Sequence, residues 1–328
     1  MYFKETFSVE PVSPDTPQAS PAGLAAFVEA EVGLTAHWGL YSVLGRHEWC
    51  YFNDRFAYAD YRQVMQRFNP VRFDAAEWAD LLLEVGVKFF TITAKHHDGF
   101  CLWDTRLTDF TITRTPFRRD VLAELSRALQ ERGIGLHFYY SLVDWTHPAY
   151  RADWAAYVAY YQGQVRELCT AYGPIAGFIF DGYWPRQGFE GDEIAYFQPG
   201  GPWDLAGTYR LIHQLQPDAV IGNNTHAPPL PGEDYQVWEL DLPGENTQGF
   251  NALAVGSRPT ASWLNLNRNW GYRPAEHRVM PLATLLDRYE RTRAQGAVLM
   301  LNVGPRPFGD IHPEEQSRLR EFGAARSR

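Results

Sequence analysis

Short apolar runs alternate with amphipathic segments along most of the chain. The apolar runs have the length of buried β-strands and cover residues 33–37, 87–93, 136–141, 175–181, 220–223, 237–240, 261–264 and 298–302. Apolar positions at helical spacing cover residues 75–85, 121–132, 154–172, 205–216 and 282–294. Because strands that alternate with helices pair in parallel, we expect an α/β protein with a (β/α)8 TIM-barrel-like fold. A doubly wound open sheet is the alternative, although no GxGxxG motif follows the first strand.

The two ends of the chain differ from this pattern. Residues 9–21 are rich in proline and serine, so we expect 1–24 to form an extended leader and 25–328 to form the barrel domain. The N-terminal sequence contains no apolar core of a signal peptide, and no segment is long and apolar enough to span a membrane. We therefore expect a cytoplasmic protein, unless a signal peptide was trimmed from its N-terminus.

Composition narrows the range of binding partners. The chain of 328 residues has 30 Lys and Arg against 39 Asp and Glu, and its net charge of −9 argues against nucleic-acid and anionic-membrane partners. Aromatic residues make up 15%, which suits either sugar binding or a large aromatic core. The three cysteines show no CxxC spacing, so we expect neither a disulfide framework nor a zinc cluster. The oligomeric state stays open, with a homo-oligomer among the possibilities.

Polar and aromatic residues follow the ends of several predicted strands. In a parallel barrel the active site forms where the strands end at their carboxyl side. The residues at these ends include His37, His96, His97, Tyr140, Asp181 and Glu239. They predict a polar pocket with aromatic walls.

Asp181 gives the sharpest signal. It follows the apolar run IAGFIF and precedes a glycine, which leaves its carboxylate accessible at the rim of the barrel. Such a carboxylate can attack an anomeric carbon and form a glycosyl-enzyme intermediate. Capping of the following loop is the structural alternative.

Three other motifs each allow more than one interpretation. The His96-His97 pair can bind a metal ion, donate hydrogen bonds to substrate hydroxyls, or pack against the barrel. Adjacent histidines on an extended segment point to opposite sides, which makes them poor ligands for a single metal. The Glu48-Trp49 pair fits either a binding loop or a plain surface loop, and Trp270 fits either the pocket or the core.

Seven segments, taken in order, resemble the glycoside hydrolase family 29 α-L-fucosidases. They are GLTAHWGLYS (33–42), HEWCYFNDRF (47–56), TITAKHHDGFCLWD (91–104), FYYSLVDW (138–145), FIFDGYW (178–184), NWGY (269–272) and LNVGP (301–305). The resemblance covers most of the chain. It implies a retaining exo-glycosidase that removes terminal α-L-fucose without a metal or an organic cofactor.

The resemblance also assigns roles to individual residues. Asp181 corresponds to the nucleophile, and Glu48, Trp49 and Trp270 fall in motifs that line the same pocket. The residues expected to hold the fucose hydroxyls are His37, His96, His97 and Tyr140.

Three departures from the family pattern stand out. Ile179 replaces a tryptophan that many members carry two residues before the nucleophile, and we expect the separate C-terminal β-sandwich to be absent. Many members also carry the acid/base glutamate shortly before the WGY triplet, where this chain has Thr260 and Ala261. The remaining candidates for the acid/base are Glu239, Glu233, Asp241 and Glu245. Glu239 is favoured because it ends a predicted strand beside Trp238, whose indole would raise the pKa of the carboxyl.

Three alternatives to a fucosidase stay open. The first is a fucose- or glycan-binding protein that lost catalysis together with its acid/base. The second is a related exo-glycosidase for another sugar, which the changes at Ile179 and Ala261 suggest. The third and most distant is a metal hydrolase that uses the three histidines.

Overall fold

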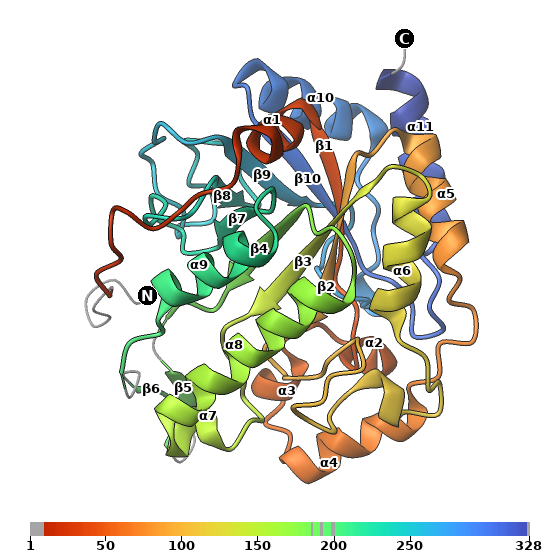
Figure 1. Ribbon diagram of the computed structural model, residues 1–328. Helices are drawn as coiled ribbons and strands as arrows, with labels where there is room; N and C mark the ends of the chain where they lie inside the picture. Colours follow the sequence, from red (N-terminus) through yellow and green to blue (C-terminus); the bar gives the residue numbers. More distant parts are fainter. Residues whose placement is uncertain (1–9, 185, 191–192, 198–200, 327–328) are drawn as a thin grey trace.

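The computed structural model describes residues 10–184, 186–190, 193–197 and 201–326, and its centre is a barrel of parallel strands (Figure 1). The eight strands follow the order β7-β4-β3-β2-β1-β10-β9-β8. Their bounds are β1 Val32–Ala36, β2 Phe89–Lys95, β3 Gly135–Ser141, β4 Gly177–Asp181, β7 Val220–Asn223, β8 Gln236–Glu239, β9 Thr260–Asn265 and β10 Val298–Val303. A parallel bridge between Gly222 and Tyr235 joins the two outer strands and closes the barrel. The predicted (β/α)8-like fold is confirmed.

Helices cover most of the outside of the barrel (Figure 1). They are α1 Pro21–Glu29, α2 Tyr41–Leu44, α3 Cys50–Asn53, α4 Tyr58–Gln63, α5 Ala75–Val85, α6 Val121–Gln130, α7 Ala149–Ala152, α8 Trp154–Ala171, α9 Leu205–Leu215, α10 Leu282–Ala294 and α11 Pro313–Arg326. The short 3₁₀ turns are Val64–Arg67, Ile112–Arg114 and Pro274–Glu276. A hairpin of β5 Arg186–Glu190 and β6 Glu193–Phe197 follows β4 and was not predicted. No helix in the described ranges combines the length and the apolar character that a membrane span requires.

Aspartates define where four of these helices begin. Each side chain accepts a hydrogen bond from a backbone N–H of the first turn, which would otherwise have no partner inside the helix. The four are Asp74, Asp120, Asp153 and Asp204, before α5, α6, α8 and α9. These caps set the start of each helix after the loop at the mouth of the barrel.

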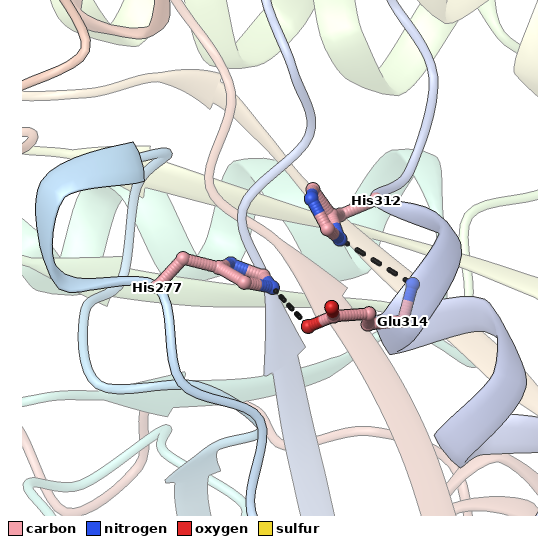
Figure 2. Close-up of side chains that lie close together, drawn as sticks. All are labelled: His277, His312 and Glu314. Carbon is pink, nitrogen blue, oxygen red and sulfur yellow. Dashed lines mark hydrogen bonds and ion pairs between the residues drawn. The ribbon is translucent and has the colours of Figure 1, made fainter.

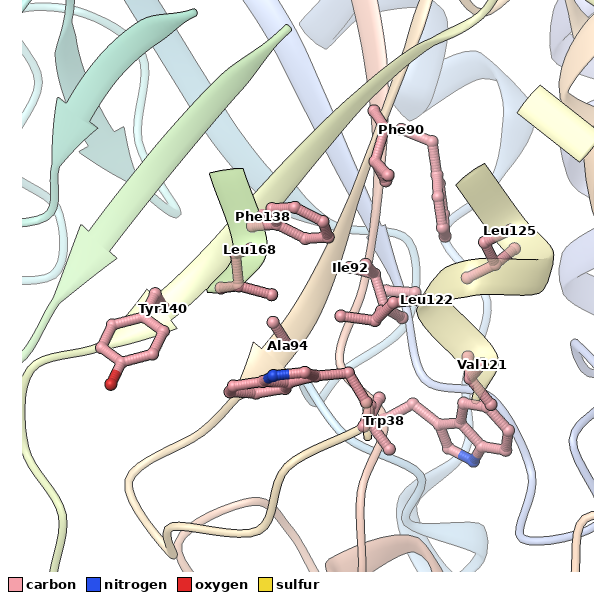
Figure 3. Packing of buried hydrophobic residues seen from close by; sticks show 14 of the residues in the cluster. Trp38, Phe90, Ile92, Ala94, Val121, Leu122, Leu125, Phe138, Tyr140 and Leu168 are labelled. Carbon is pink, nitrogen blue, oxygen red and sulfur yellow. The ribbon is translucent and has the colours of Figure 1, made fainter. Parts of the chain in front are cut away.

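Side chains alternate between the inside of the barrel and the layer beneath the helices. Phe138 and Tyr140 of β3 point outward and pack with Phe90, Ile92 and residues of α6 and α8 (Figure 3). Tyr139 and Ile179 belong to the separate cluster that fills the inside. Since successive residues of a strand face opposite sides, this alternation decides which residues reach the mouth of the barrel.

The N-terminal segment closes the floor of the barrel. Phe27 of α1 is buried, and its ring centroid lies 4.4 Å from that of Tyr235 and 5.5 Å from that of Phe89. Upstream of α1, the backbone N–H of Ala19 donates a 2.9 Å hydrogen bond to the carboxylate of Asp234, just before β8. The boundary predicted at residue 24 therefore falls inside α1, and the described part of the leader packs along the β7–β8 junction.

The plug formed by α1 gives a stability prediction. Phe27→Ala should lower the free energy of unfolding by about 3–5 kcal/mol, because it opens a cavity at the barrel floor. Val28→Ala, one residue further on an exposed face, should change it by less than about 0.5 kcal/mol. Denaturant unfolding measures both. Equal effects of the two substitutions would contradict the plug.

Candidate active site

A cavity of about 250 Å³ opens at the carboxyl ends of the strands. Its lining combines two carboxyl groups with aromatic and amide side chains. The lining residues are Trp49, His97, Asp181, Trp184, Asn224, His226, Glu239 and Phe250. Four of the predicted site residues therefore line one cavity, as the strand-end argument expects.

Asp181 is the last residue of β4, and its carboxylate accepts several hydrogen bonds. The hydroxyl of Tyr139 donates to Oδ2 at 2.8 Å, and the backbone N–H of Gly182 donates to Oδ1 at 2.8 Å. Nε2 of His97 lies 3.6 Å from Oδ2. Burial, followed by the nearby charge of Glu239, raises the pKa of Asp181 to about 7, although the hydrogen bonds from Tyr139, Gly182 and Asn224 oppose the rise.

Glu239 ends β8 and lies close to Asp181. The side-chain amide of Asn224 donates to Glu239 Oε2 at 2.7 Å and lies 3.5 Å from Asp181 Oδ1. Because one nitrogen contacts both oxygens, these oxygens are no more than about 6 Å apart. Nε2 of His226 also lies 3.7 Å from Oε2 of Glu239.

Burial raises the pKa of Glu239, while hydrogen bonds from Asn224 and Trp270 oppose the rise. From the sequence we expected the indole of Trp238 to cause this rise, and that expectation is wrong. Trp238 faces the other side of β8, where its Nε1–H donates a 3.0 Å hydrogen bond to the carbonyl of Ala252.

The other acid/base candidates lie outside the cavity. Glu233 accepts hydrogen bonds from the Tyr209 hydroxyl at 2.7 Å and from Asn223 at 3.1 Å, and Glu245 pairs with two arginines of α10. Asp241 accepts hydrogen bonds from Asn251 and Thr247 within its own loop. None of the three appears among the lining residues.

Ala261, where the family pattern predicts the acid/base glutamate, lies far from the cavity. Ala261 is the second residue of β9 and is paired with Val298 and Val237, near the floor of the barrel. A carboxyl group there would lie near the start of its strand, whereas Asp181 lies at the end of β4, so the two would be at opposite ends of the barrel.

The three predicted histidines lie close together in a buried part of the barrel. Ring centroids of His96 and His97 are 4.2 Å apart, and those of His37 and His96 are 5.5 Å apart. Burial lowers the pKa of all three, to about 4 for His37. His37 contacts Asn302 at 2.7 Å, His97 contacts Ser141 at 2.6 Å, and Nδ1 of His96 is buried without a hydrogen-bond partner in the described structure. Neutral imidazoles of this kind can both donate and accept hydrogen bonds.

Loops after β1 and β9 supply the remaining predicted site residues. Glu48 is buried, and its carboxylate accepts a 3.1 Å hydrogen bond from the backbone N–H of Gly271. Trp49 lies against His97, with ring centroids 5.2 Å apart. The ring centroid of Trp270 lies 5.0 Å from that of His37, and its side chain forms a hydrogen bond with Glu239. Of these three predicted residues, Trp49 lines the cavity, whereas Glu48 and Trp270 lie behind its lining.

Comparison with known proteins identifies the family. The family model described as alpha-L-fucosidase matches residues 10–325. The chain belongs to the alpha-L-fucosidase family. The resemblance to glycoside hydrolase family 29 is thereby confirmed.

Individual relatives agree with this assignment. Alpha-L-fucosidase 1 of Arabidopsis thaliana is 32% identical over 78% of this chain and 52% of its own length. The tissue alpha-L-fucosidase of Rattus norvegicus is 26% identical over 95% of this chain and 70% of its own. The chain spans about half the length of the plant relatives that it matches.

Solved structures share the fold. Isoenzyme 1 from Paenibacillus thiaminolyticus superposes with a TM-score of 0.79 at 30% identity, over 93% of this chain and 75% of the other. A GH29 alpha-L-fucosidase from Bacteroides thetaiotaomicron, trapped as a covalent intermediate with 2-fluoro-fucosyl fluoride, has a TM-score of 0.80 at 25% identity, over 100% and 78%.

In this member of the alpha-L-fucosidase family, Tyr140 does not lie in the pocket. Its hydroxyl donates a 2.7 Å hydrogen bond to Gln164 of α8, and Nζ of Lys95 lies 4.5 Å from its ring centroid. Its neighbour Tyr139 faces inward and reaches Asp181. The expectation for Tyr140 is corrected because β3 pairs Tyr139 with Ile179 and Ser141 with Asp181, so that odd-numbered residues of β3 share the inner face with Asp181.

Several lining residues were not predicted. Asn224 directly follows β7, and inward alternation from Val220 and Gly222 could have indicated it. His226 and Phe250 come from the loop-rich segment between β7 and β9, and their ring centroids lie 4.5 Å apart. No periodic signal marks residues of such a loop.

The raised pKa of Asp181 gives a pH-dependent prediction. Its charged form is disfavoured in the folded state, so its contribution to stability is complete below the unfolded pKa of 3.8 and is lost as pH rises through about 7. Asp181→Asn removes this loss and should raise the free energy of unfolding above pH 7 by roughly 2–4 kcal/mol. Near pH 4 the difference from wild type should vanish.

Thermal unfolding at a series of pH values measures this difference. Asp287→Asn, at an exposed carboxylate, is the matched control and should show no such pH dependence. A stability difference between Asp181→Asn and wild type that stays constant from pH 4 to pH 8 would contradict the shift.

Proposed function

We propose that this protein is a retaining exo-α-L-fucosidase in which Asp181 is the nucleophile and Glu239 the general acid/base. The observation that carries the proposal is the amide of Asn224, which contacts both carboxyl groups. Retaining glycosidases need the two carboxyls about 5–5.5 Å apart, whereas inverting ones need about 6.5–9.5 Å to admit a water. A limit of about 6 Å between the contacted oxygens supports retention.

The proposed first step divides the work between the two acids. Ionised Asp181 attacks the anomeric carbon while protonated Glu239 gives its proton to the departing oxygen. Burial favours the protonated form of both acids, and hydrogen bonds favour the ionised form of both, from Tyr139, Gly182 and Asn224 at Asp181 and from Asn224 and Trp270 at Glu239. Because a charge on one acid disfavours a charge on the other, the pair favours a state with one proton, which the proposed first step places on Glu239.

In the second step the proposed roles of Glu239 reverse. The carboxylate of Asp181 becomes an uncharged ester in the glycosyl-enzyme, so its repulsion of a charge on Glu239 disappears. Glu239, now ionised, takes a proton from the water that attacks the anomeric carbon and releases the sugar. The electrostatic coupling between the two acids therefore supports both halves of the reaction.

The shape and lining of the pocket support a single terminal sugar as substrate. A cavity of about 250 Å³ is smaller than the ~300–1,000 Å³ of sites for drug-sized ligands. His97 lines the cavity, and its imidazole is suited to bind a hydroxyl group, while His96 packs against its ring. Fucose as the sugar, and carbohydrate as the partner, rest on the family. The oligomeric state and a cytoplasmic location stay predictions.

Hydrolysis of an aryl α-L-fucoside tests the two roles. Asp181→Ala should lose at least about 10⁴-fold in kcat, because no covalent intermediate can form. Glu239→Gln should lose activity strongly on substrates with poor leaving groups, whereas Glu233→Gln, the matched buried control, should retain it. Activity retained by Glu239→Gln and lost by Glu233→Gln would overturn the assignment.

Azide distinguishes the two carboxyls by product. With Glu239→Ala, azide should attack the intermediate and yield the α-L-fucosyl azide. With Asp181→Ala, azide should take the place of the nucleophile and yield the β-anomer. Substrate binding without any hydrolysis by the wild-type protein would favour a binding protein instead.

The Tyr139–Asp181 hydrogen bond predicts a shift in the pH profile. Tyr139→Phe removes a bond that lowers the pKa of Asp181, so that pKa should rise. Since Asp181 acts when ionised, the acidic limb of the kcat/KM profile should move to higher pH. Tyr140→Phe should leave the limb in place, and an equal shift in both variants would contradict the inward placement of Tyr139.

A further inference from the structure

Three metal-binding side chains converge where the loop after β9 meets the start of α11 (Figure 2). His277 follows the 3₁₀ turn Pro274–Glu276, His312 immediately precedes α11, and Glu314 lies in the first turn of α11. One ligand atom from each residue lies within 4.8 Å of the other two. Among the described residues, this is the group of His, Cys, Asp or Glu side chains whose ligand atoms lie close enough together to hold one metal ion. It does not include His37, His96 or His97.

The donor atoms of this cluster carry the lone pairs that a metal needs. Nε2 of His277 is buried, has no hydrogen-bond partner in the described structure, and lies 3.4 Å from Oε2 of Glu314. The backbone N–H of Glu314 donates a long 3.3 Å hydrogen bond to Nδ1 of His312, so this nitrogen is the unprotonated one, and a metal bound there would replace that hydrogen bond. Figure 2 shows both nitrogens turned toward Glu314.

Electrostatics argue against a purely ionic explanation of the cluster. The rings of His277 and His312 have centroids 3.9 Å apart, so a charge on one imidazole disfavours a charge on the other. Glu314 is exposed, so its ion pair with His277 gains little in water. A single divalent cation would engage all three groups at once.

We propose that His277, His312 and Glu314 bind a divalent transition metal, with zinc the best match to the donors. Two imidazole nitrogens and a carboxylate oxygen are ordinary zinc ligands, with bonds of about 2.0–2.2 Å. In a tetrahedron with such bonds, the ligand atoms are about 3.4 Å apart, which is the observed separation of His277 Nε2 and Glu314 Oε2. Water completes the coordination, and a small movement of the exposed Glu314 or of the His312 ring brings the third ligand into range.

The metal would tie the loop after β9 to α11. In that loop, Trp270 forms a hydrogen bond with Glu239, and Gly271 forms one with Glu48. The same loop is tied to α11 by Asn267, whose side-chain amide donates a hydrogen bond to the buried Glu315. The bound metal would therefore stabilise the segment behind one wall of the pocket. This binding is independent of the proposed enzymatic activity.

Calorimetric titration of the metal-free full chain with Zn²⁺ tests the proposal. We expect one saturable site, whose affinity falls at least about tenfold in His277→Ala, His312→Ala and Glu314→Gln. Glu276→Gln, which makes the same charge change nearby without removing a ligand, should bind Zn²⁺ as wild type does. Absence of a saturable site, or equal affinity in all variants, would overturn the proposal.

A second measurement covers the case in which a histidine variant does not fold. Glu314 is exposed, so Glu314→Gln should unfold at the wild-type temperature in the absence of metal. Co²⁺ bound to the wild type should give the visible absorption of nitrogen and oxygen ligands without a thiolate band, because the three cysteines are buried elsewhere. A thiolate band, or an identical Co²⁺ spectrum in Glu314→Gln, would place the metal at another site and contradict the proposal.

Discussion

A side chain reaches the mouth of this barrel only if it lies on the inner face of its strand. Asp181 and Glu239 are the last residues of β4 and β8 and both face inward, whereas their neighbours Phe180 and Trp238 face outward. The barrel must close for these two strands to face one another, and it closes through the bridge from Gly222 to Tyr235 and the hydrogen bonds between Ile221 and Asp234. A Cβ on Gly222 would lie 2.3 Å from the Tyr235 ring, so glycine is needed there. The position of the two acids therefore rests on backbone alternation and on this junction.

Two acids held this close in a buried site favour a state with one charge rather than two. Burial raises the pKa of both Asp181 and Glu239, and each charge disfavours the other. The amide of Asn224 contacts both carboxyls and can donate to either. Such an arrangement lowers the stability of the folded protein at neutral pH, which is common where a site is built for chemistry rather than for packing.

The sequence predicted the barrel well because buried parallel strands read as continuous apolar runs, and all eight predicted strands were found within two residues. It did not predict α1 or α11, since proline and serine precede the first and α11 buries few apolar side chains. The strand ends correctly pointed to Asp181 and Glu239. Tyr139 and Tyr140 are adjacent and chemically identical, so the sequence does not show which of them faces inward, and only the register of β3 against β4 shows that Tyr139 does. Loop residues such as His226 and Phe250 reach the cavity through tertiary packing, which local patterns do not encode.

The most direct test of this account is to map the covalent adduct formed with 2-fluoro-fucosyl fluoride. The slow substrate should label the wild-type protein once, and mass spectrometry of its peptides should place the label on Asp181. Asp181→Asn should take up no label under the same conditions. A label on another carboxylate, or turnover of α-L-fucosides without any trapped adduct and with inversion at the anomeric carbon, would contradict the proposed mechanism.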